Sequence, residues 1–238
     1  RKAIGEAGVE ELLKATIDTA VTTKAVRPAE FERVIVDSTV QEKAIAHPVD
    51  SRLLEIARAK VVQSAKFAGI LLKQTFVKEG RELRRKAGGY AHAKQFKRLR
   101  RVVKRQRTIL GIVIREIQRK LSAASTDSPS RITRLNTLLE RAERIRTQQP
   151  KDKNKLYALH APEVECIGKG KARKPYEFGV KTSIAVTHKS GLMVGARTFP
   201  GNPYDGHVLN QQVTTRQQTG HPIPDLIRLP LHHRVKLT

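Results

Sequence analysis

The amino-acid sequence predicts a mixed α/β fold in which a first strand, a long helical block and a β-hairpin follow one another. Three observations support this order. A β-branched run lies within Phe31–Val40, apolar residues recur every three to four positions between residues 51 and 150, and two strand-like segments meet at a short turn containing Gly191. We therefore expect one sheet whose first strand and hairpin are separated by a helical insertion.

The first strand is expected at Phe31–Val40, where the continuous apolar run Val34-Ile35-Val36 is typical of a strand buried on both faces. Asp37 follows this run directly, so its carboxylate is expected near the end of the strand. A helix is expected before the strand, over Glu6–Thr23, because its leucine, isoleucine and valine residues fall on one side.

The helical block is expected to begin near Asp50, a residue type that caps helices and that follows a proline-containing stop. Gly88-Gly89 is expected to break the helical pattern. A second helix is expected over Ala91–Leu121 and a third over Arg131–Gln148. We expect this block to pack beside the sheet.

The hairpin is expected to pair Tyr176–His188 with Leu192–Phe199 through the turn Lys189-Ser190-Gly191. Alternating apolar residues and a short glycine-containing turn are typical of two antiparallel strands. The first strand and both hairpin strands are therefore expected in a single sheet.

The charge of the chain favours a polyanionic partner. There are 47 lysines and arginines against 22 acidic residues, a formal net charge of +25, and self-repulsion at that charge is relieved by binding a polyanion. Nucleic acid is favoured over an anionic membrane surface, because a clustered basic charge is its usual footprint. No apolar run approaches the roughly 20 residues that span a bilayer, so a cytoplasmic, nucleoid-associated protein without a membrane partner is expected. The single Cys166 excludes an internal disulfide.

The basic residues are concentrated between Arg81 and Lys120, where fifteen lysines and arginines face two acidic residues. Four of these residues share one face of the predicted second helix: Lys97, Arg101, Lys104 and Arg105. They could contact several phosphates of a duplex without recognising its base sequence. The alternative is a solvated helix face. A basic loop at Gly168–Lys174 could touch phosphate or be a flexible connection, and it lacks the P-loop spacing. The candidate DNA-binding residues are Lys94, Lys97, Arg98, Arg101, Lys104, Arg105, Lys169 and Lys171.

Asp37 is the acidic residue that could carry chemistry. A carboxylate at the end of a buried strand can project over the sheet edge and hold a divalent metal, although a turn or capping aspartate is the alternative reading. Asp205 has the sequence context of a turn aspartate that caps a helix. The histidines have no metal-ligand spacing, and no nucleophile-elbow motif is present.

Two segments, Val36–Leu54 and Lys155–His207, resemble the DDE transposases of bacterial insertion sequences, and the resemblance extends over most of Phe31–His207. It implies an incomplete ribonuclease H-like sheet with a large all-helical insertion between strands one and two. It also implies that Asp37, in its D-[ST]-T-V motif, is the first catalytic carboxylate and a Mg²⁺ ligand. The implied organisation is an N-terminal helix and first catalytic strand at 1–50, a basic helical insertion at 51–150, the hairpin part of the catalytic domain at 151–210 and a divergent tail at 211–238.

The resemblance implies metal-dependent cleavage and joining of DNA strands, at element ends and target DNA, by in-line attack assisted by two Mg²⁺ ions. A homodimer is a further expected partner. The family's second and third carboxylates lie in motifs that this sequence lacks, since Asp205 precedes the relevant helix and Asp225 lacks the following glycine and aromatic residue. The chain therefore reads as truncated at both ends and inactive alone, with weak or absent Mg²⁺ binding. The alternatives are a non-catalytic basic DNA-binding protein and a fragment that pairs with full-length transposase and inhibits it.

Overall fold

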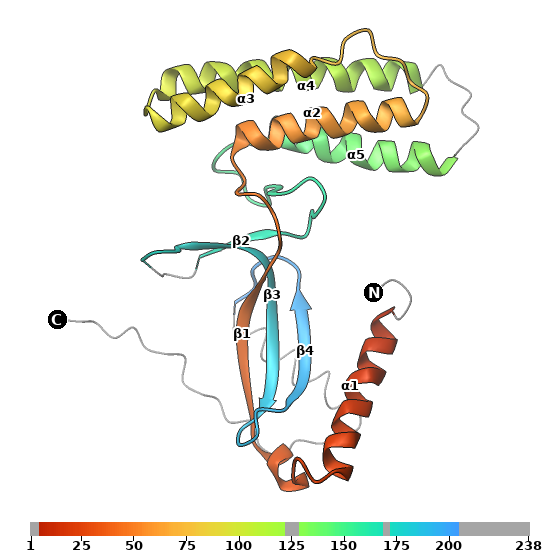
Figure 1. Ribbon diagram of the computed structural model, residues 1–238, viewed down its shortest axis with the longest axis vertical. Helices are drawn as coiled ribbons and strands as arrows, with labels where there is room; N and C mark the ends of the chain where they lie inside the picture. The colour runs from red at the N-terminus through yellow and green to blue at the C-terminus, as the bar shows by residue number, and fades with distance from the viewer. Residues whose placement is uncertain (1–4, 122–128, 169–171, 205–238) are drawn as a thin grey trace, which may run out of the picture. The chain divides into compact units, whose positions relative to one another are not determined.

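The computed structural model describes residues 5–121, 129–168 and 172–204, and these residues form a mixed α/β structure (Figure 1). Five α-helices and a four-stranded sheet occur in the described ranges, which confirms the predicted mixture of helices and strands. The chain divides into two compact units. The first unit draws on 1–42 and 167–238, and the second unit is formed by 43–166.

The first unit contains the sheet, in which β3 pairs with β1 on one side and with β4 on the other, antiparallel in both cases. The predicted first strand and both hairpin strands therefore lie in one sheet, as expected. The short strand β2 is the remaining member of the sheet. The elements are α1 (Gly5–Thr22), the 3-10 helix η1 (Pro28–Glu32), β1 (Val34–Glu42), β2 (Glu165–Gly168), β3 (Tyr176–Thr187) and β4 (Met193–Phe199).

The ladder between β1 and β3 begins and ends later along the chain than the predicted strand Phe31–Val40. It runs from Val34 opposite Thr187 to Glu42 opposite Gly179. Asp37 lies opposite Ile184 inside this ladder, and β1 continues for five residues beyond it, so the prediction that Asp37 lies near a strand end is wrong. The residues after Asp37 include β-branched side chains that favour continued pairing. Glycine is required at 179, since a Cβ there would lie 2.2 Å from the carbonyl oxygen of Gln41.

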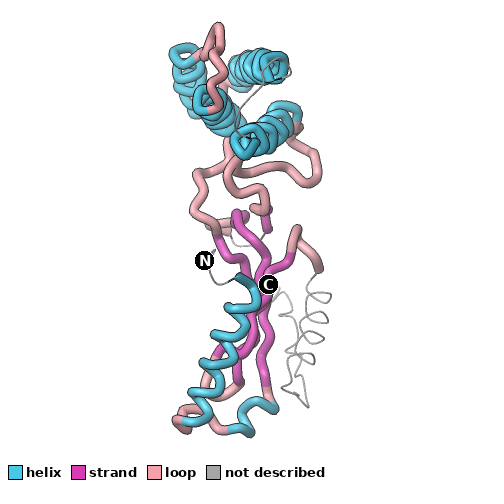
Figure 2. The backbone as a smooth tube through the Cα atoms, turned by 90° about the vertical axis from the view of Figure 1, so that its right-hand side faces the viewer, coloured by secondary structure: helices cyan, strands magenta, loops and turns pink. Residues whose placement is uncertain are grey.

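Helix α1 covers one face of the sheet. Ile17 of α1 is buried in a cluster with Val34, Ala185 and Val194, one from each of the three longer strands. Figure 2 shows α1 running beside the strands. Val36 also packs against this cluster, and because successive side chains of a strand alternate between faces, Asp37 belongs to the opposite face.

The second unit is a bundle of four helices with a hydrophobic core of its own. Helix α2 contacts each of the other three helices, and the core contains Leu54, Leu110 and Leu135 among its most buried side chains. The helical block thus forms a bundle with its own core, whereas we expected it to belong with the sheet. The helices are α2 (Asp50–Phe67), α3 (Val77–His92), α4 (Phe96–Leu121) and α5 (Pro129–Thr147).

Helix α2 begins at Asp50 and α4 ends at Leu121, as expected, but the N-cap residue of α2 is Val49 and not Asp50. The boundaries between these two points differ from the prediction. Gly88-Gly89 lies inside α3, so the predicted break there is wrong. The chain turns instead after α2, where Gly69 has a φ of +77°, and after α3, where Lys94 has a φ of 54°. Helix α4 consequently begins at Phe96 rather than at residue 91.

A buried ion pair holds α3 against α2. Arg58 donates to both carboxylate oxygens of Glu55, at 2.9 and 2.7 Å, and also to the carbonyl oxygen of Thr75 at 2.7 Å. Gly80 of α3 lies directly over this pair, because a Cβ at that position would be 2.3 Å from Oε2 of Glu55 and 2.7 Å from Nε of Arg58. The close approach of α3 to α2 therefore depends on a glycine at position 80.

Replacing Gly80 by alanine should lower the free energy of unfolding by about 1–3 kcal/mol, as overpacking of a tight contact does. The added methyl group must displace a pair whose atoms are held by three hydrogen bonds. Urea unfolding followed by circular dichroism measures the change. Gly88→Ala and Gly89→Ala are matched controls in the same helix, with nothing within 4 Å of an added Cβ. They should be stabilised by about 0.5–1 kcal/mol through helix propensity alone. An equal change in the free energy of unfolding in all three variants contradicts the proposed contact.

Candidate nucleic-acid interface

The predicted basic residues of α4 lie on its solvent side. The side chains of Lys97, Arg98, Arg101, Lys104 and Arg105 are all exposed. The opposite side of the helix is buried in the core through a set of apolar residues that includes Val102, Ile109, Leu110, Val113 and Ile117. The spacing of three to four residues in the sequence therefore gives the expected amphipathic helix.

Lys94 does not belong to that helix. It lies in the turn between α3 and α4, with a left-handed backbone conformation and an N–H that donates to the carbonyl oxygen of Ala91 at 3.1 Å. Lys94 is exposed, but its direction is set by the turn and not by the face of α4. The prediction that Lys94 lies on the second helix is therefore wrong.

Two of the five candidate DNA-binding residues on α4 already have partners. Arg105 donates to both carboxylate oxygens of Glu79 on α3, at 2.7 and 3.1 Å, and this contact raises the pKa of Arg105. The guanidinium of Arg98 lies 5.9 Å from the ring centroid of Tyr90 and donates to Gln95. The side-chain nitrogens of Lys97, Arg101 and Lys104 have no ion-pair partner among the described residues, and we name these three the α4 basic face.

The two acidic residues between Arg81 and Lys120 do not neutralise this face. Glu82 pairs with Lys86 on its own helix, at 2.6 Å. Glu116 accepts from Nζ of Lys120 and from the backbone N–H of Lys73, both at 2.8 Å, and these two hydrogen bonds lower the pKa of its carboxyl group. The positive charge of the α4 basic face is therefore left to solvent and to ligands.

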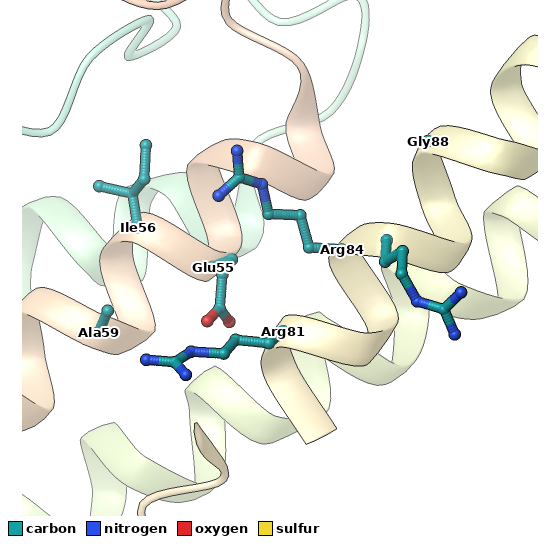
Figure 3. Close-up of a pocket in the computed structure, with 7 residues that line it drawn as sticks. Glu55, Ile56, Ala59, Arg81, Arg84 and Gly88 are labelled. Carbon is teal, nitrogen blue, oxygen red and sulfur yellow. The ribbon is translucent and has the colours of Figure 1, made fainter. Parts of the chain in front are cut away.

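A second basic site, which the sequence analysis did not single out, lies between α2 and α3. It is a groove of about 460 Å³. Figure 3 shows Arg81 and Arg84 extending from α3 on either side of the Glu55 carboxylate of α2. The spacing of Arg81, Arg84 and Arg85 by three and four residues is the signal that could have identified the groove. The predicted helix break at 88–89 obscured it. The groove is lined by Glu55, Ile56, Ala59, Arg81, Arg84, Arg85 and Gly88.

Asp37 is an exposed carboxylate on the sheet face opposite α1, with Ile184 directly across the ladder. No group of three or more His, Cys, Asp or Glu residues that could hold a metal occurs in the described part of the chain. Lys169, Lys171, Asp205 and Asp225 lie outside the described residues.

Comparison with known proteins gives one informative relative. The chain is 50% identical over 96 residues to a Rhizobium meliloti protein named uncharacterized protein ORF8 in nfe locus. The match covers 40% of this chain and 46% of the relative, so it spans about half of that protein's length. No family model and no solved structure matches the chain. Across the helices described, none is long and apolar enough to cross a membrane.

Glu116→Gln should lower the free energy of unfolding at pH 7 by about 1 kcal/mol, because the charge-assisted bonds from Lys120 and Lys73 are weakened. The pKa of Glu116 is lowered in the folded state, so its contribution is present above the unfolded-state value and is lost as the pH falls through the folded-state pKa. Unfolding curves of both proteins should therefore converge in acid. A difference that is the same at pH 7 and in acid contradicts this account.

Proposed function

We propose that this chain is part of an insertion-sequence DDE transposase, that it binds DNA, and that Asp37 is the first metal-ligating carboxylate of the catalytic domain. The observation that carries the proposal is the resemblance of Val36–Leu54 and Lys155–His207 to that family. The location in the nucleoid and a homodimer follow from the same proposal.

The arrangement of the strands supports a ribonuclease H-like domain. The resemblance implies a first strand carrying Asp37, a helical insertion and then two further strands. The structure contains β1, four helices and the antiparallel pair β3 and β4 in that order along the chain. Asp37 is exposed on β1, where a carboxylate could meet further ligands.

The α4 basic face supports DNA binding. Lys97, Arg101 and Lys104 project from one side of a helix over roughly two turns, a distance of about 10 Å at 1.5 Å per residue. One strand of duplex DNA carries a phosphate every 3.4 Å along its axis, so three neighbouring phosphates are within reach. The contact involves charge alone and should therefore be insensitive to base sequence.

The DNA-binding prediction is that the chain binds duplex DNA with little sequence preference and with an affinity that falls steeply as salt rises. Replacing Lys97, Arg101 and Lys104 together by alanine should reduce the slope of log K against log salt by about 2.7, or about 0.9 for each lost phosphate contact. Fluorescence anisotropy of a labelled duplex over a salt series measures the slope.

The structure supplies a control for this experiment. Arg105 lies on the same helix but is paired with Glu79, so Arg105→Ala should change the slope less than Arg101→Ala does. The fourfold variant that adds Arg105→Ala to the other three should behave nearly as the threefold variant. An unchanged slope in both multiple variants places the binding surface elsewhere.

The catalytic prediction is that the chain alone does not cleave DNA. Asp37 is the one position of this sequence that matches the family's three carboxylates, and a lone carboxylate holds magnesium weakly. A nicking assay with element-end DNA and Mg²⁺ or Mn²⁺ should show no cleavage by the wild type or by Asp37→Ala. A fusion that supplies the family's other two carboxylates after His207 should cleave, and Asp37→Ala should abolish that activity. Metal-dependent cleavage by the unfused chain contradicts the prediction.

A further inference from the structure

We infer that the groove between α2 and α3 is a second DNA-backbone contact of the helical unit, in which Arg81, Arg84 and Arg85 bind the phosphodiester strand. The inference rests on the proposed DNA-binding function and deepens it, because it assigns a contact outside the α4 basic face. The groove involves a different pair of helices, α2 and α3, and all of its lining residues belong to one compact unit.

The arginines of the groove carry uncompensated charge. Glu55 is the acidic residue of the lining, but both of its oxygens already accept hydrogen bonds from Arg58. Arg81, Arg84 and Arg85 are exposed and have no ion pair among the described residues. Three guanidinium groups thus line one groove while its single carboxylate is held by a fourth. Such an arrangement favours an anionic ligand.

The groove is preformed. The contact of Gly80 with the Glu55–Arg58 pair fixes α3 on α2, and the bond from Arg58 to Thr75 fixes the segment that leads into α3. Arg81 and Arg84 follow Gly80 by one and four residues, so their backbone positions are set by the same contact. A ligand therefore orders only the arginine side chains when it binds, which lowers the entropic cost of binding.

The dimensions fit a nucleic-acid strand. From Arg81 to Gly88, helix α3 rises about 10 Å, which corresponds to about three phosphates of one duplex strand. Guanidinium groups match phosphate oxygens in a bidentate geometry. An acidic peptide is less well suited, because acidic peptides are often recognised by main-chain pairing with a strand edge, and the groove lies between two helices.

Gly88 and Gly89 provide a matched pair of substitutions. Both are exposed residues of α3 with nothing within 4 Å of an added Cβ, but only Gly88 lines the groove. Gly88→Glu places a carboxylate among the arginines, whereas Gly89→Glu adds the same charge to the neighbouring position. Both changes replace a helical glycine by a better helix former, so both proteins should fold at least as well as the wild type.

The experiment measures duplex DNA binding by anisotropy for the full chain and these two variants. Gly88→Glu should weaken binding at least fivefold, and Gly89→Glu less than twofold. The double variant Arg81→Ala/Arg84→Ala should reduce the salt slope by about 1.8, in addition to the loss caused by removing the α4 basic face. These results together support a backbone contact in the groove.

Other outcomes overturn the inference separately from the proposed function. Equal weakening by Gly88→Glu and Gly89→Glu shows a general charge effect and excludes the groove contact, while DNA binding through the α4 basic face stands. Unchanged DNA binding in Gly88→Glu, with binding of labelled polyglutamate that this variant loses, makes the groove an acidic-peptide site. Failure of the wild type to bind DNA at low salt overturns both proposals, because the groove inference depends on the proposed DNA binding.

Discussion

The buried pair of Glu55 and Arg58 sets how closely α3 lies against α2 in the second unit. A buried charge is costly unless it is paired and hydrogen-bonded, and here the three bonds from Arg58 satisfy both carboxylate oxygens and a backbone carbonyl. The absence of a side chain at Gly80 then allows α3 to lie against the pair. Helix α3 in turn presents Glu79 to Arg105 of α4. The close approach of α3 to α2 therefore depends on one polar contact beneath a glycine, whereas α4 is held mainly by its apolar side in the core.

Two basic helices lie side by side in this unit because local ion pairs and apolar packing hold them together. Helices α3 and α4 pack against each other although both carry clusters of arginine and lysine. Each acidic residue of these two helices forms an ion pair with a nearby lysine or arginine: Glu79, Glu82 and Glu116. The apolar side of α4 is buried in the core. The exposed charged side chains of α3 and α4 that have no partner are almost all positive. Repulsion among these groups is tolerated because packing holds the helices, and an anionic ligand would relieve it.

The sequence predicted the pieces that depend on local pattern. The periodicities of two and of three to four residues located the strands and most of the helices, and the charge pattern located the exposed side of α4. Gly88-Gly89 was misread because glycine costs about 1 kcal/mol per residue in a helix, a cost that tertiary packing of α3 overrides. Asp37 was predicted near a strand end because the apolar run stops just before it. The end of an apolar run does not show where pairing with the neighbouring strand ends.

Contacts between helices could not be predicted from local sequence patterns. The Arg81–Arg84–Arg85 groove requires knowing that α2 lies beside α3, and the pairing of Arg105 requires knowing that Glu79 faces it from another helix. Local pattern therefore counted Arg105 as equal to Arg101, although one is held in an ion pair and the other is not. The same limit applies to Asp37, because spacing along one strand does not show which side chains of the neighbouring strands lie beside it.

The residues proposed for DNA binding and the residue proposed for metal ligation belong to different parts of this chain. The basic residues belong to a helical unit with its own core, whereas Asp37 belongs to a sheet whose core is formed with α1. Substitutions at the surface of one core should not disturb the packing of the other, because sites without shared partners act independently. Contacts made through charge position DNA without selecting a phosphodiester, and a carboxylate that holds a metal selects a phosphodiester without adding much affinity. A chain that binds DNA but does not cleave it is therefore a physically consistent product of this structure.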